Sequence, residues 1–216
     1  MNETLQKASR IGLMADTHGS VADLEVSIVA LKKAGADALI HLGDFCDSVR
    51  TGRLEDIIAM LIRENVAAVM GNNDFQILNR LKSNSLDLPN RSRETVLAFL
   101  RSTPVIRNID GICFAHSLPY DNIRSFYEPI DDGTVLRAAD IFSESPHRVI
   151  FCGHSHLPAL FVWHAGVVTR QASIAKRIVP FVPENRYIIV VGSPSSGECG
   201  IYDSGRHQYE RVLLDI

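Results

Sequence analysis

Short apolar runs alternate with amphipathic segments along the first third of the chain. The apolar runs occupy residues 11–16, 36–44 and 66–74, and each of them ends in polar or acidic side chains. Between them, residues 20–35 and 54–62 place apolar side chains at helical spacing. Near-continuous apolar strands that alternate with such helices predict a parallel sheet covered on both faces.

The remainder of the chain predicts two more helices, a hairpin and then mainly strands. Residues 88–104 have the pattern of a helix that ends at a proline, and residues 105–117 that of a hairpin with an Asp-Gly turn. A helix is expected over residues 134–142, followed by a strand over residues 148–156. Only short strands are predicted beyond it, so we expect the last part of the chain to be antiparallel.

The length and charge of the chain are those of an ordinary globular protein. Its 216 residues suffice for one domain with its own core, and we predict a single domain over residues 1–216 with residues 1–10 frayed. The formal net charge of -3 argues against a dominant nucleic-acid or anionic-membrane surface. Any anionic substrate must therefore be held by local features of a site.

The sequence also predicts the cellular compartment and argues against sites built from cysteine pairs. No apolar run approaches the roughly 20 residues that a membrane span needs, and the N-terminal segment is too polar for a secretory signal. We therefore expect a cytoplasmic protein that does not enter a membrane. The four cysteines form no CxxC pair, so neither a disulfide framework nor a thiolate zinc site is predicted.

Five predicted strands end in side chains that can bind a metal ion. In parallel sheets, functional loops gather beyond the carboxyl ends of the strands. Residues two apart in extended chain share a face, with Cα atoms roughly 6.6 Å apart, which suits two metal ions about 3.5 to 4 Å apart. Carboxylate, imidazole and amide ligands without thiolate suit Mn, Fe, Zn or Ni. The strand ends are Asp16-Thr17-His18, Gly43-Asp44, Gly71-Asn72, Ala115-His116 and Gly153-His154-Ser155-His156.

The motifs DTH, GD, GNND, AHS and GHSH, in this order over residues 16–156, resemble those of the calcineurin-like metallophosphoesterases. Within that superfamily the chain is most similar to the small bacterial and archaeal phosphodiesterases. The similarity lies in its length, its GHSHLP motif and its late VGSPSSGECGIYD segment. The resemblance implies an α/β fold, a four-layer α/β/β/α sandwich in which helices flank two central mixed β-sheets.

The resemblance also implies a dinuclear metal centre. One ion would be held by Asp16, His18, Asp44 and His156. The other would be held by Asp44, Asn72, His116 and His154, with Asp44 bridging the two. Two such ions would lower the pKa of a shared solvent ligand to roughly 7, so that a metal-bound hydroxide attacks the phosphorus atom. They would also supply the local positive field that an acidic protein needs to bind an anion.

The third motif departs from the common pattern of the superfamily. Its usual histidine, thought to stabilise or protonate the leaving group, is replaced by Asn73, an amide that cannot titrate near neutral pH. General-acid assistance is typically worth 10² to 10⁴ in rate, so its loss disfavours monoesters with poor leaving groups. Members without this histidine tend to favour diesters. The resemblance thus implies a phosphodiesterase with Asp44, Asn73 and Asp74 in catalytic roles.

Other functions stay open at this point. A non-catalytic interaction scaffold on the same fold is disfavoured by intact ligands at all seven positions, whereas a nucleotide pyrophosphohydrolase or a protein phosphatase remains an alternative. We expect a small phosphorylated substrate, and a homo-oligomer is compatible with the sequence. Residues 117–133 could form an aromatic substrate wall or a packed surface loop. The histidines without a motif are read as ordinary structural residues: His41, His147, His164 and His207.

Overall fold

Two six-stranded sheets form the centre of the computed structural model, which describes residues 2–172, 174 and 177–215. The first sheet has the order β3 (Ala67–Ala68), β2 (Ala38–His41), β1 (Arg10–Met14), β11 (Glu198–Asp203), β12 (Gln208–Leu213) and β9 (Ile178–Pro180). The second has the order β4 (Ile106–Ile109), β5 (Ile112–Ala115), β6 (Val149–Cys152), β10 (Asn185–Val190), β7 (Ala159–His164) and β8 (Val167–Gln171).

Both sheets are mixed. In the first sheet β1, β2 and β3 are parallel, as the alternation of strands and helices predicts, while β11, β12 and β9 join them in antiparallel register. In the second sheet β5, β6 and β10 are parallel, and the hairpins β4–β5 and β7–β8 are antiparallel. The expectation of a wholly antiparallel last part was wrong for β10, because this strand inserts between β6 and β7.

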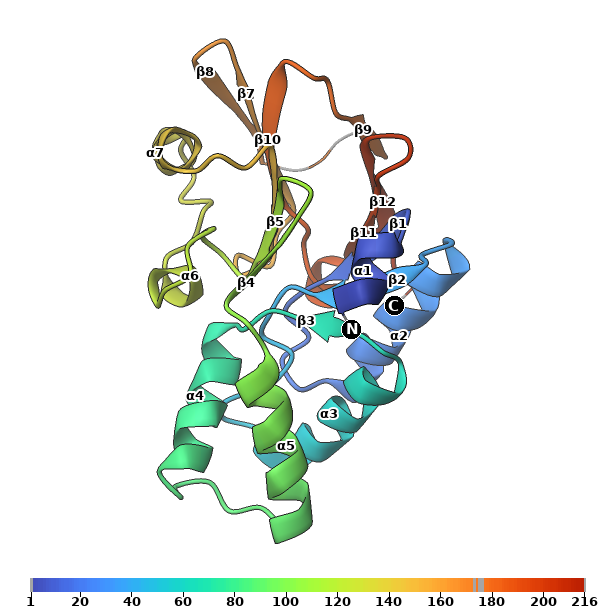
Figure 1. The fold of residues 1–216 in the computed structure, drawn as a ribbon, viewed down its shortest axis with the longest axis vertical. Helices are drawn as coiled ribbons and strands as arrows, with labels where there is room; N and C mark the ends of the chain where they lie inside the picture. The colour runs from blue at the N-terminus through green and yellow to red at the C-terminus, as the bar shows by residue number, and fades with distance from the viewer. Residues whose placement is uncertain (1, 173, 175–176, 216) are drawn as a thin grey trace.

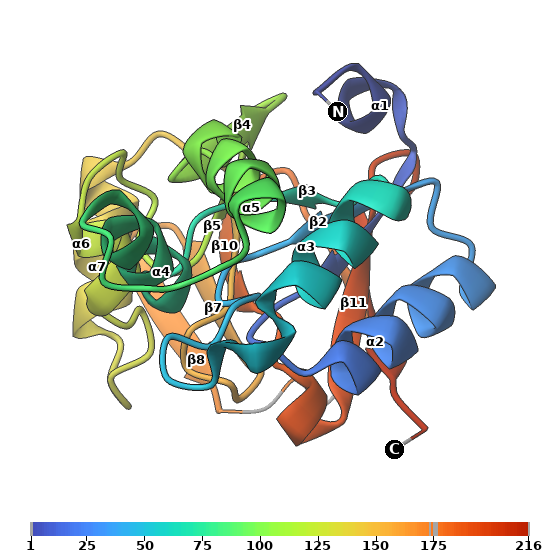
Figure 2. The same ribbon diagram turned by 90° about the horizontal axis from the view of Figure 1, so that it is seen from below.

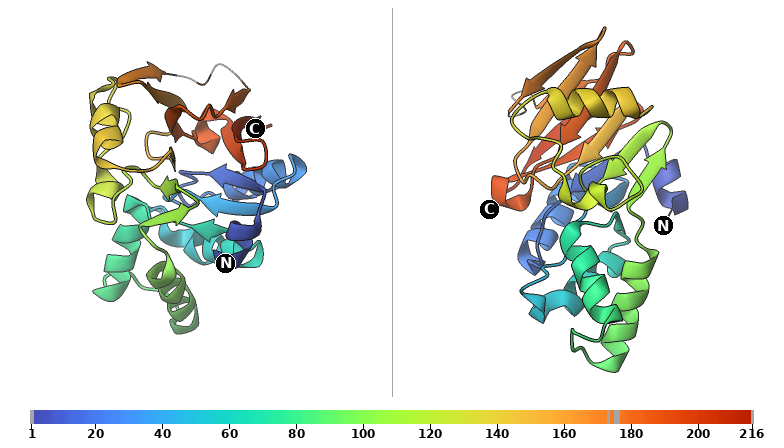
Figure 3. Two further views of the ribbon diagram at one scale, coloured as in Figure 1. Left: turned by 45° about the horizontal axis from the view of Figure 1, so that its top comes forward. Right: turned by 90° about the vertical axis from the view of Figure 1, so that its left-hand side faces the viewer.

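Helices cover the two outer faces of the sheet pair. On the first sheet lie α2 (Val21–Lys33) and α3 (Leu54–Arg63), followed by α4 (Asn72–Lys82) and α5 (Asn90–Ser102). On the second sheet lie α6 (Arg124–Tyr127) and α7 (Leu136–Glu144). Figures 1 and 3 show α6 and α7, drawn in yellow, on the opposite side of the strands from the blue α2. The four-layer α/β/β/α sandwich is thereby confirmed.

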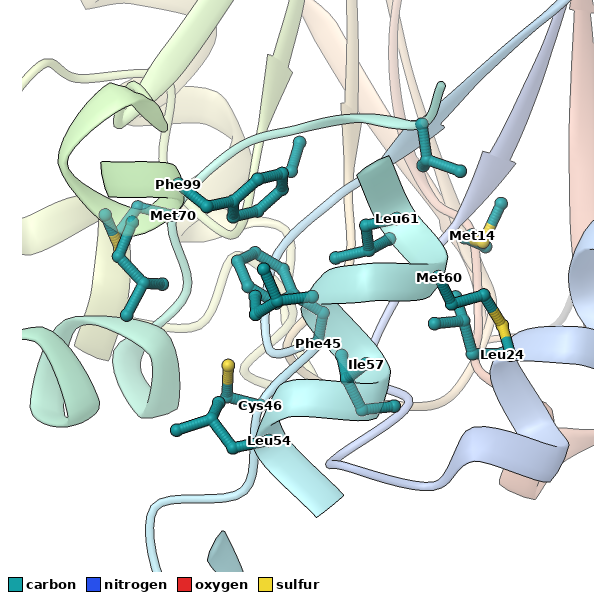
Figure 4. Packing of buried hydrophobic residues seen from close by; sticks show 14 of the residues in the cluster. Met14, Leu24, Phe45, Cys46, Leu54, Ile57, Met60, Leu61, Met70 and Phe99 are labelled. Carbon is teal, nitrogen blue, oxygen red and sulfur yellow. The ribbon is translucent and has the colours of Figure 1, made fainter. Parts of the chain in front are cut away.

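Three apolar clusters correspond to the three interfaces between these layers. Successive strand residues face opposite sides, so Leu39 packs under the helices of the first sheet while Ile40 packs between the two sheets. In the cluster under α3, Phe45 packs edge-on against Phe99 of α5, with ring centroids 5.8 Å apart (Figure 4). A third cluster lies between the second sheet and α7. Burial on both faces explains the continuous apolar runs.

Local signals in the sequence correctly mark the ends of α2. The Ser20 side chain accepts a hydrogen bond of 3.2 Å from the backbone N–H of Asp23, which caps the start of the helix. Gly35 follows its last turn with a φ of +87°, a left-handed conformation that glycine adopts without strain. The predicted Asp110-Gly111 turn likewise joins β4 to β5.

The structure also differs from the sequence-based expectations at the N-terminus, in the third strand and directly after it. Residues 1–10 were expected to be frayed, yet the described part of this segment forms α1 (Asn2–Lys7), and Leu5 is buried in the core between the sheets. The third strand shortens to two residues, because after Val69, whose N–H still donates to His41 O, the chain leaves β2 and Met70 donates its N–H to Pro104 O. Helix α4 was not predicted, and it begins within the GNND motif.

None of the helices in the described ranges combines the length and apolar character that a membrane crossing requires.

Two short 3₁₀ helices, η1 (Thr51–Arg53) and η2 (Pro194–Ser196), complete the elements that bear on the site.

Candidate metal centre

All seven predicted ligands lie at one end of the sandwich, where strand ends of both sheets meet. The first sheet contributes the loops that follow β1 and β2 and the start of α4, which carry Asp16, His18, Asp44 and Asn72. The second sheet contributes the residues that follow β5 and β6, which carry His116, His154 and His156. The strand-end pattern in the sequence therefore corresponds to a real cluster in space.

One group of donor atoms consists of Asp16, His18 and His156. The Nε2 atoms of His18 and His156 lie 2.9 Å apart, and His156 Nε2 lies 3.8 Å from Asp16 Oδ1. Asp16 Oδ2 accepts a hydrogen bond of 2.9 Å from the backbone N–H of His154, whereas the buried Oδ1 atom has no hydrogen-bond partner among the described residues. A divalent cation would satisfy this buried oxygen, so the group fits a metal ion.

A second group consists of Asn72, His116 and His154. His116 donates its Nδ1 hydrogen to Leu42 O over 3.0 Å, so its Nε2 atom carries a lone pair. This lone pair is directed at Asn72 Oδ1, 3.1 Å away, and at His154 Nδ1, 3.0 Å away. The opposite amide orientation of Asn72 would place a nitrogen there and satisfy the rings without a cation. With the oxygen in this place, the three acceptors converge as metal ligands do.

Asp44 lies between these two groups. Its Oδ2 atom is 3.9 Å from His18 Nε2, and its Oδ1 atom is 3.7 Å from His116 Nε2. Donor atoms of Asp16, Asp44 and His116 also lie within 4.8 Å of one another, which links the two groups. This position suits a carboxylate that contacts ions on both sides. Oxygen and nitrogen donors without thiolate suit divalent ions of the Mn, Fe, Zn and Ni type.

Burial favours the neutral form of three imidazoles of the cluster. It lowers the pKa of His154 to about 4, with a further contribution from the neighbouring His116, and it also lowers the pKa values of His116 and His156. Burial and the nearby Asp44 carboxylate raise the pKa of Asp16 well above its ordinary value. A neutral imidazole can bind a cation without first losing a proton, whereas a cation beside Asp16 would favour the ionised form of its carboxyl group.

The backbone of the site is held in an uncommon conformation. A positive φ is unusual for residues other than glycine, and it persists only where the surrounding structure enforces it. Here it recurs at five of the predicted ligands, with φ values between 44° and 70°: Asp16, His18, Asp44, His154 and His156. These turns direct successive side chains of one loop toward the same point, which a regular strand or helix would not do.

Two glycines allow backbone segments to approach the ligands closely. A Cβ atom on Gly71 would lie 2.2 Å from Asp44 Oδ1, and one on Gly153 would lie 2.6 Å from Asp16 Oδ2. Both distances are shorter than any real contact of such atoms. The glycines of the GNND and GHSH motifs are thus required by the packing of the carboxylates.

Asn73 holds the proposed bridging carboxylate rather than lying free in a turn. Its backbone N–H and its Nδ2 donate to the two oxygens of Asp44 over 2.8 and 2.7 Å, and its Oδ1 accepts from the N–H and hydroxyl of Ser48. Both Asn72 and Asn73 belong to the first turn of α4, and neither has a left-handed backbone conformation. Asp44 also faces the positive end of this helix.

Asp74 does not reach the reacting side of the site. It is fully buried and accepts hydrogen bonds of 2.8 to 2.9 Å from the backbone N–H groups of Asp44, Cys46 and Gly71. Burial and the charge of Asp44 raise the pKa of this carboxyl group. The carboxylate of Asp74 thus fixes the loop after β2 against the start of α4 and is not among the residues that line the cleft described below. A catalytic role for Asp74 stays a prediction.

Among the histidines without a motif, His41 supports the site from the core. It is fully buried in β2, and its Nε2 lies 3.0 Å from the hydroxyl oxygen of Thr17. In the sequence, Thr17 stands between the predicted ligands Asp16 and His18. Its ring packs edge-on against Phe45. The structural reading of His41 therefore holds, and His147, His164 and His207 are not placed in the cluster.

The burial of His41 predicts a loss of stability in acid. Burial lowers the pKa of His41 from 6.5 to about 3, so between these values the unfolded chain binds a proton that the folded protein does not. Stability from this group is complete above pH 6.5 and falls by about 1.4 kcal/mol per pH unit below it. Urea unfolding of the metal-free protein at pH 7, 6 and 5 measures this slope.

The variant His41→Gln should flatten the slope by about that amount per pH unit. The matched variant at an exposed position, His207→Gln, should leave the slope unchanged. Equal slopes in the parent protein and in His41→Gln would contradict the assignment.

The cluster opens into a polar cleft of about 620 Å³. Besides predicted ligands and Asn73, its walls include three side chains that the sequence did not indicate: Asp47, Arg50 and Ser195. The late segment reaches the site through Ser193, whose hydroxyl donates to His156 O over 3.1 Å. No spacing in the sequence links these residues to the motifs, because separate loops bring them to the cleft.

The aromatic segment after His116 does not line this cleft. Phe126 is buried and packs against Phe75 of α4, with ring centroids 4.9 Å apart. Arg124 pairs with Glu128 and lies over the ring of Tyr120. Of the two readings of residues 117–133, the structure favours the packed surface loop.

Comparison with known proteins identifies the family. The model of the calcineurin-like phosphoesterase superfamily domain matches residues 10–173, which include all seven clustered ligand candidates. The chain belongs to this superfamily. Its members are generally hydrolases, and the chain has all the metal-ligand candidates of the superfamily pattern. No curated protein sequence matches the chain significantly.

Solved structures similar to this chain support the fold. A metallophosphoesterase from Sphaerobacter thermophilus is 21% identical, with a TM-score of 0.71 over 97% of this chain and 89% of its own. A putative diadenosine tetraphosphatase is 20% identical, with a TM-score of 0.57 over 95% and 94% of the two chains. The protein TT1561 of Thermus thermophilus is 13% identical, with a TM-score of 0.53 over 96% and 99%. At these identities the likeness concerns the fold.

Proposed function

We propose that this protein is a dinuclear metal-dependent phosphodiesterase that hydrolyses a small nucleotide-type or related diester. The observation that carries the proposal is the position of Asn73, whose amide lies at the wall of the cleft and donates to Asp44. Bound divalent ions supply an activated solvent nucleophile and positive charge for the phosphoryl oxygens. The protein's own residues then determine which leaving groups can depart from the ester.

The side chains lining the cleft offer no suitable proton donor apart from the ligand candidates. Asn73 cannot titrate, and hydrogen bonds from Arg50 and Val49 outweigh the effect of burial and hold the pKa of Asp47 below its ordinary value. In monoester hydrolysis the bond to the leaving oxygen is largely broken in the transition state, so this oxygen carries much charge and needs a proton. A site without a general acid therefore favours diesters and esters with good leaving groups.

The convergence of seven donor residues also bears on the alternatives. A scaffold that only binds other proteins has no need for a buried carboxylate oxygen without a partner or for strained ligand loops. These features support an enzyme. A pyrophosphohydrolase has the same requirement for cations, so dinucleoside polyphosphates belong in the substrate screen beside cyclic nucleotides, dinucleotides and simple diesters.

Rates on an aryl phosphodiester and the matching aryl monoester, with Mn²⁺ added, test the proposal. We expect the diester to be hydrolysed at least about tenfold faster, since the looser transition state of the monoester places more charge on its leaving oxygen. A strong preference for the monoester would contradict the assignment.

The variant Asn73→His tests the reason for this preference. Restoring an imidazole at the cleft wall should raise hydrolysis of an alkyl monoester by about 10²-fold. An aryl monoester, whose leaving group needs little protonation, should gain much less. Asn73→Gln serves as the control that alters the side chain without adding a titratable group. Equal gains on both esters would show that Asn73 does not set the leaving-group requirement.

A further inference from the structure

The outward face of α2 exposes apolar side chains beside β12. Val29, in the middle of the helix, is 57% exposed, and Leu213 on β12 is 67% exposed. With the partly buried Val26, Ala30 and Val212 they border an apolar groove of about 600 Å³. Figure 2 shows α2 at the outer edge of the molecule. The groove shares no lining residue with the polar cleft of the metal centre.

Two opposite charges flank this apolar face symmetrically. Glu25 and Lys33 lie four residues before and four residues after Val29, so all three project from the same side of the helix. Both are exposed, and neither forms an ion pair within the described ranges. Their neighbour Lys32 is different, because it pairs with Glu64 over 2.7 Å. The two free charges therefore remain available to a partner.

We infer that a second copy of this chain docks on the groove, with the two α2 helices antiparallel and related by a two-fold axis at Val29. In such a pair, residues equally distant from Val29 on either side face each other. Glu25 of each protomer then meets Lys33 of the other, while the two Val29 side chains meet on the axis. One surface is thus complementary to itself, as an isologous interface requires.

The charge pattern distinguishes this occupant from others. An anionic membrane surface would be repelled by Glu25 and by Asp215, which outnumber Lys33 along the groove. An unrelated helix would need the reversed charge order at the same spacing around an apolar residue. A second copy supplies that order by symmetry alone, and it also covers Leu213 and the apolar wall of α2.

A single introduced cysteine tests the position of the axis. In the variant Val29→Cys, two thiols facing each other would reduce one molecule of oxidised glutathione and form a disulfide between protomers, with release of two reduced glutathiones. The native cysteines are buried and do not compete. Leu136→Cys, at a 70% exposed position on α7, is the matched control. We expect a cross-linked dimer with the first variant at least about tenfold faster than with the second. Equal rates would overturn the proposal.

Charge reversal tests the antiparallel pairing. Glu25→Lys places two like-charged pairs across the axis, and Lys33→Glu does the same with negative charges. Each variant should raise the dimer dissociation constant by about tenfold or more in sedimentation equilibrium at low salt. A one-to-one mixture of the two variants restores both opposite-charge pairs and should recover the parent constant as a heterodimer. Hydrolytic activity with Mn²⁺ should be unchanged, because these residues lie outside the cleft.

Three outcomes would overturn the inference. A parent protein that stays monomeric at about 100 μM would lack the interface, since a specific homodimer is expected to assemble well below that concentration. Variants that weaken the dimer without recovery on mixing would show that the helices do not pair antiparallel. Growth beyond dimers would show an open contact in place of a two-fold one.

Discussion

Asp44→Asn is expected to reduce metal-dependent hydrolysis by about 10³-fold, since it removes the charge that lies between the two donor groups. The carboxylate approaches His18 and His116 from its two oxygens, so its loss affects both proposed ion positions at once. Calorimetric titration with Mn²⁺ should show weaker binding at both sites. Initial rates on the aryl diester measure the catalytic loss.

The fold should survive this change. Asp44 is buried beside Asp16 and Asp74, and its negative charge raises the pKa of both carboxyl groups. Removing that charge relieves repulsion, which offsets the weakened hydrogen bond from Asn73. We expect the melting temperature of the metal-free variant to lie within about 4 °C of the parent. The stabilisation that Mn²⁺ gives to the parent should be largely lost.

Asp56→Asn is the matched control, because this carboxylate is exposed on α3 and belongs neither to the cluster nor to the lining of the cleft. It should leave rates and metal affinity unchanged. Full activity in Asp44→Asn would refute the bridging role of the carboxylate.

Gly71→Ala is expected to lower the free energy of unfolding by about 3 kcal/mol and to weaken metal binding. The backbone of Gly71, with φ -101° and ψ 177°, is one that alanine adopts readily, so the cost is steric. The added methyl group would overlap both Asp44 Oδ1 and the Asp44 backbone nitrogen, 2.2 and 2.3 Å away. Either the carboxylate or the start of α4 must move, and both carry predicted ligands.

Urea unfolding of the metal-free protein and Mn²⁺ titration measure the two effects. Gly52→Ala in η1 is the matched control, since a methyl group there would meet no atom within 4 Å. It should change stability by less than about 0.5 kcal/mol. If Gly71→Ala matched this control in both measurements, the close approach described for Gly71 would not matter energetically.

The layers of the fold could be predicted because burial leaves a strong pattern in the sequence. Strands such as β1 and β2 are buried on both faces and read as apolar runs, and the capped ends of α2 are marked by Ser20 and Gly35. Helix α4 was missed although Asp74, Ile77, Leu78 and Leu81 have helical spacing and are buried. The polar motif at its start concealed the helix, because its first turn consists of site residues.

The identity of the clustered residues could also be predicted, whereas their detailed contacts could not. Five strand ends with His, Asp or Asn indicated the seven ligand candidates. The pattern did not reveal that Asp74 binds three backbone N–H groups, nor that Ser193 reaches His156 from the other end of the chain. These contacts depend on how separate loops fold against each other, and no short spacing in the sequence records that.

The division of the ligand candidates between the two sheets has a mechanical consequence. A cation held by Asp16 of the first sheet and His156 of the second would act as a cross-link across the apolar layer between them. Parting of the sheets and loss of the ion would then be a single event, and each bound ion would add to the resistance of that layer to opening. Chelation should therefore speed hydrogen exchange most in the strands that face this layer. Only a chain whose two sheets had aligned correctly would acquire its ions, so metal loading would serve as a check on folding.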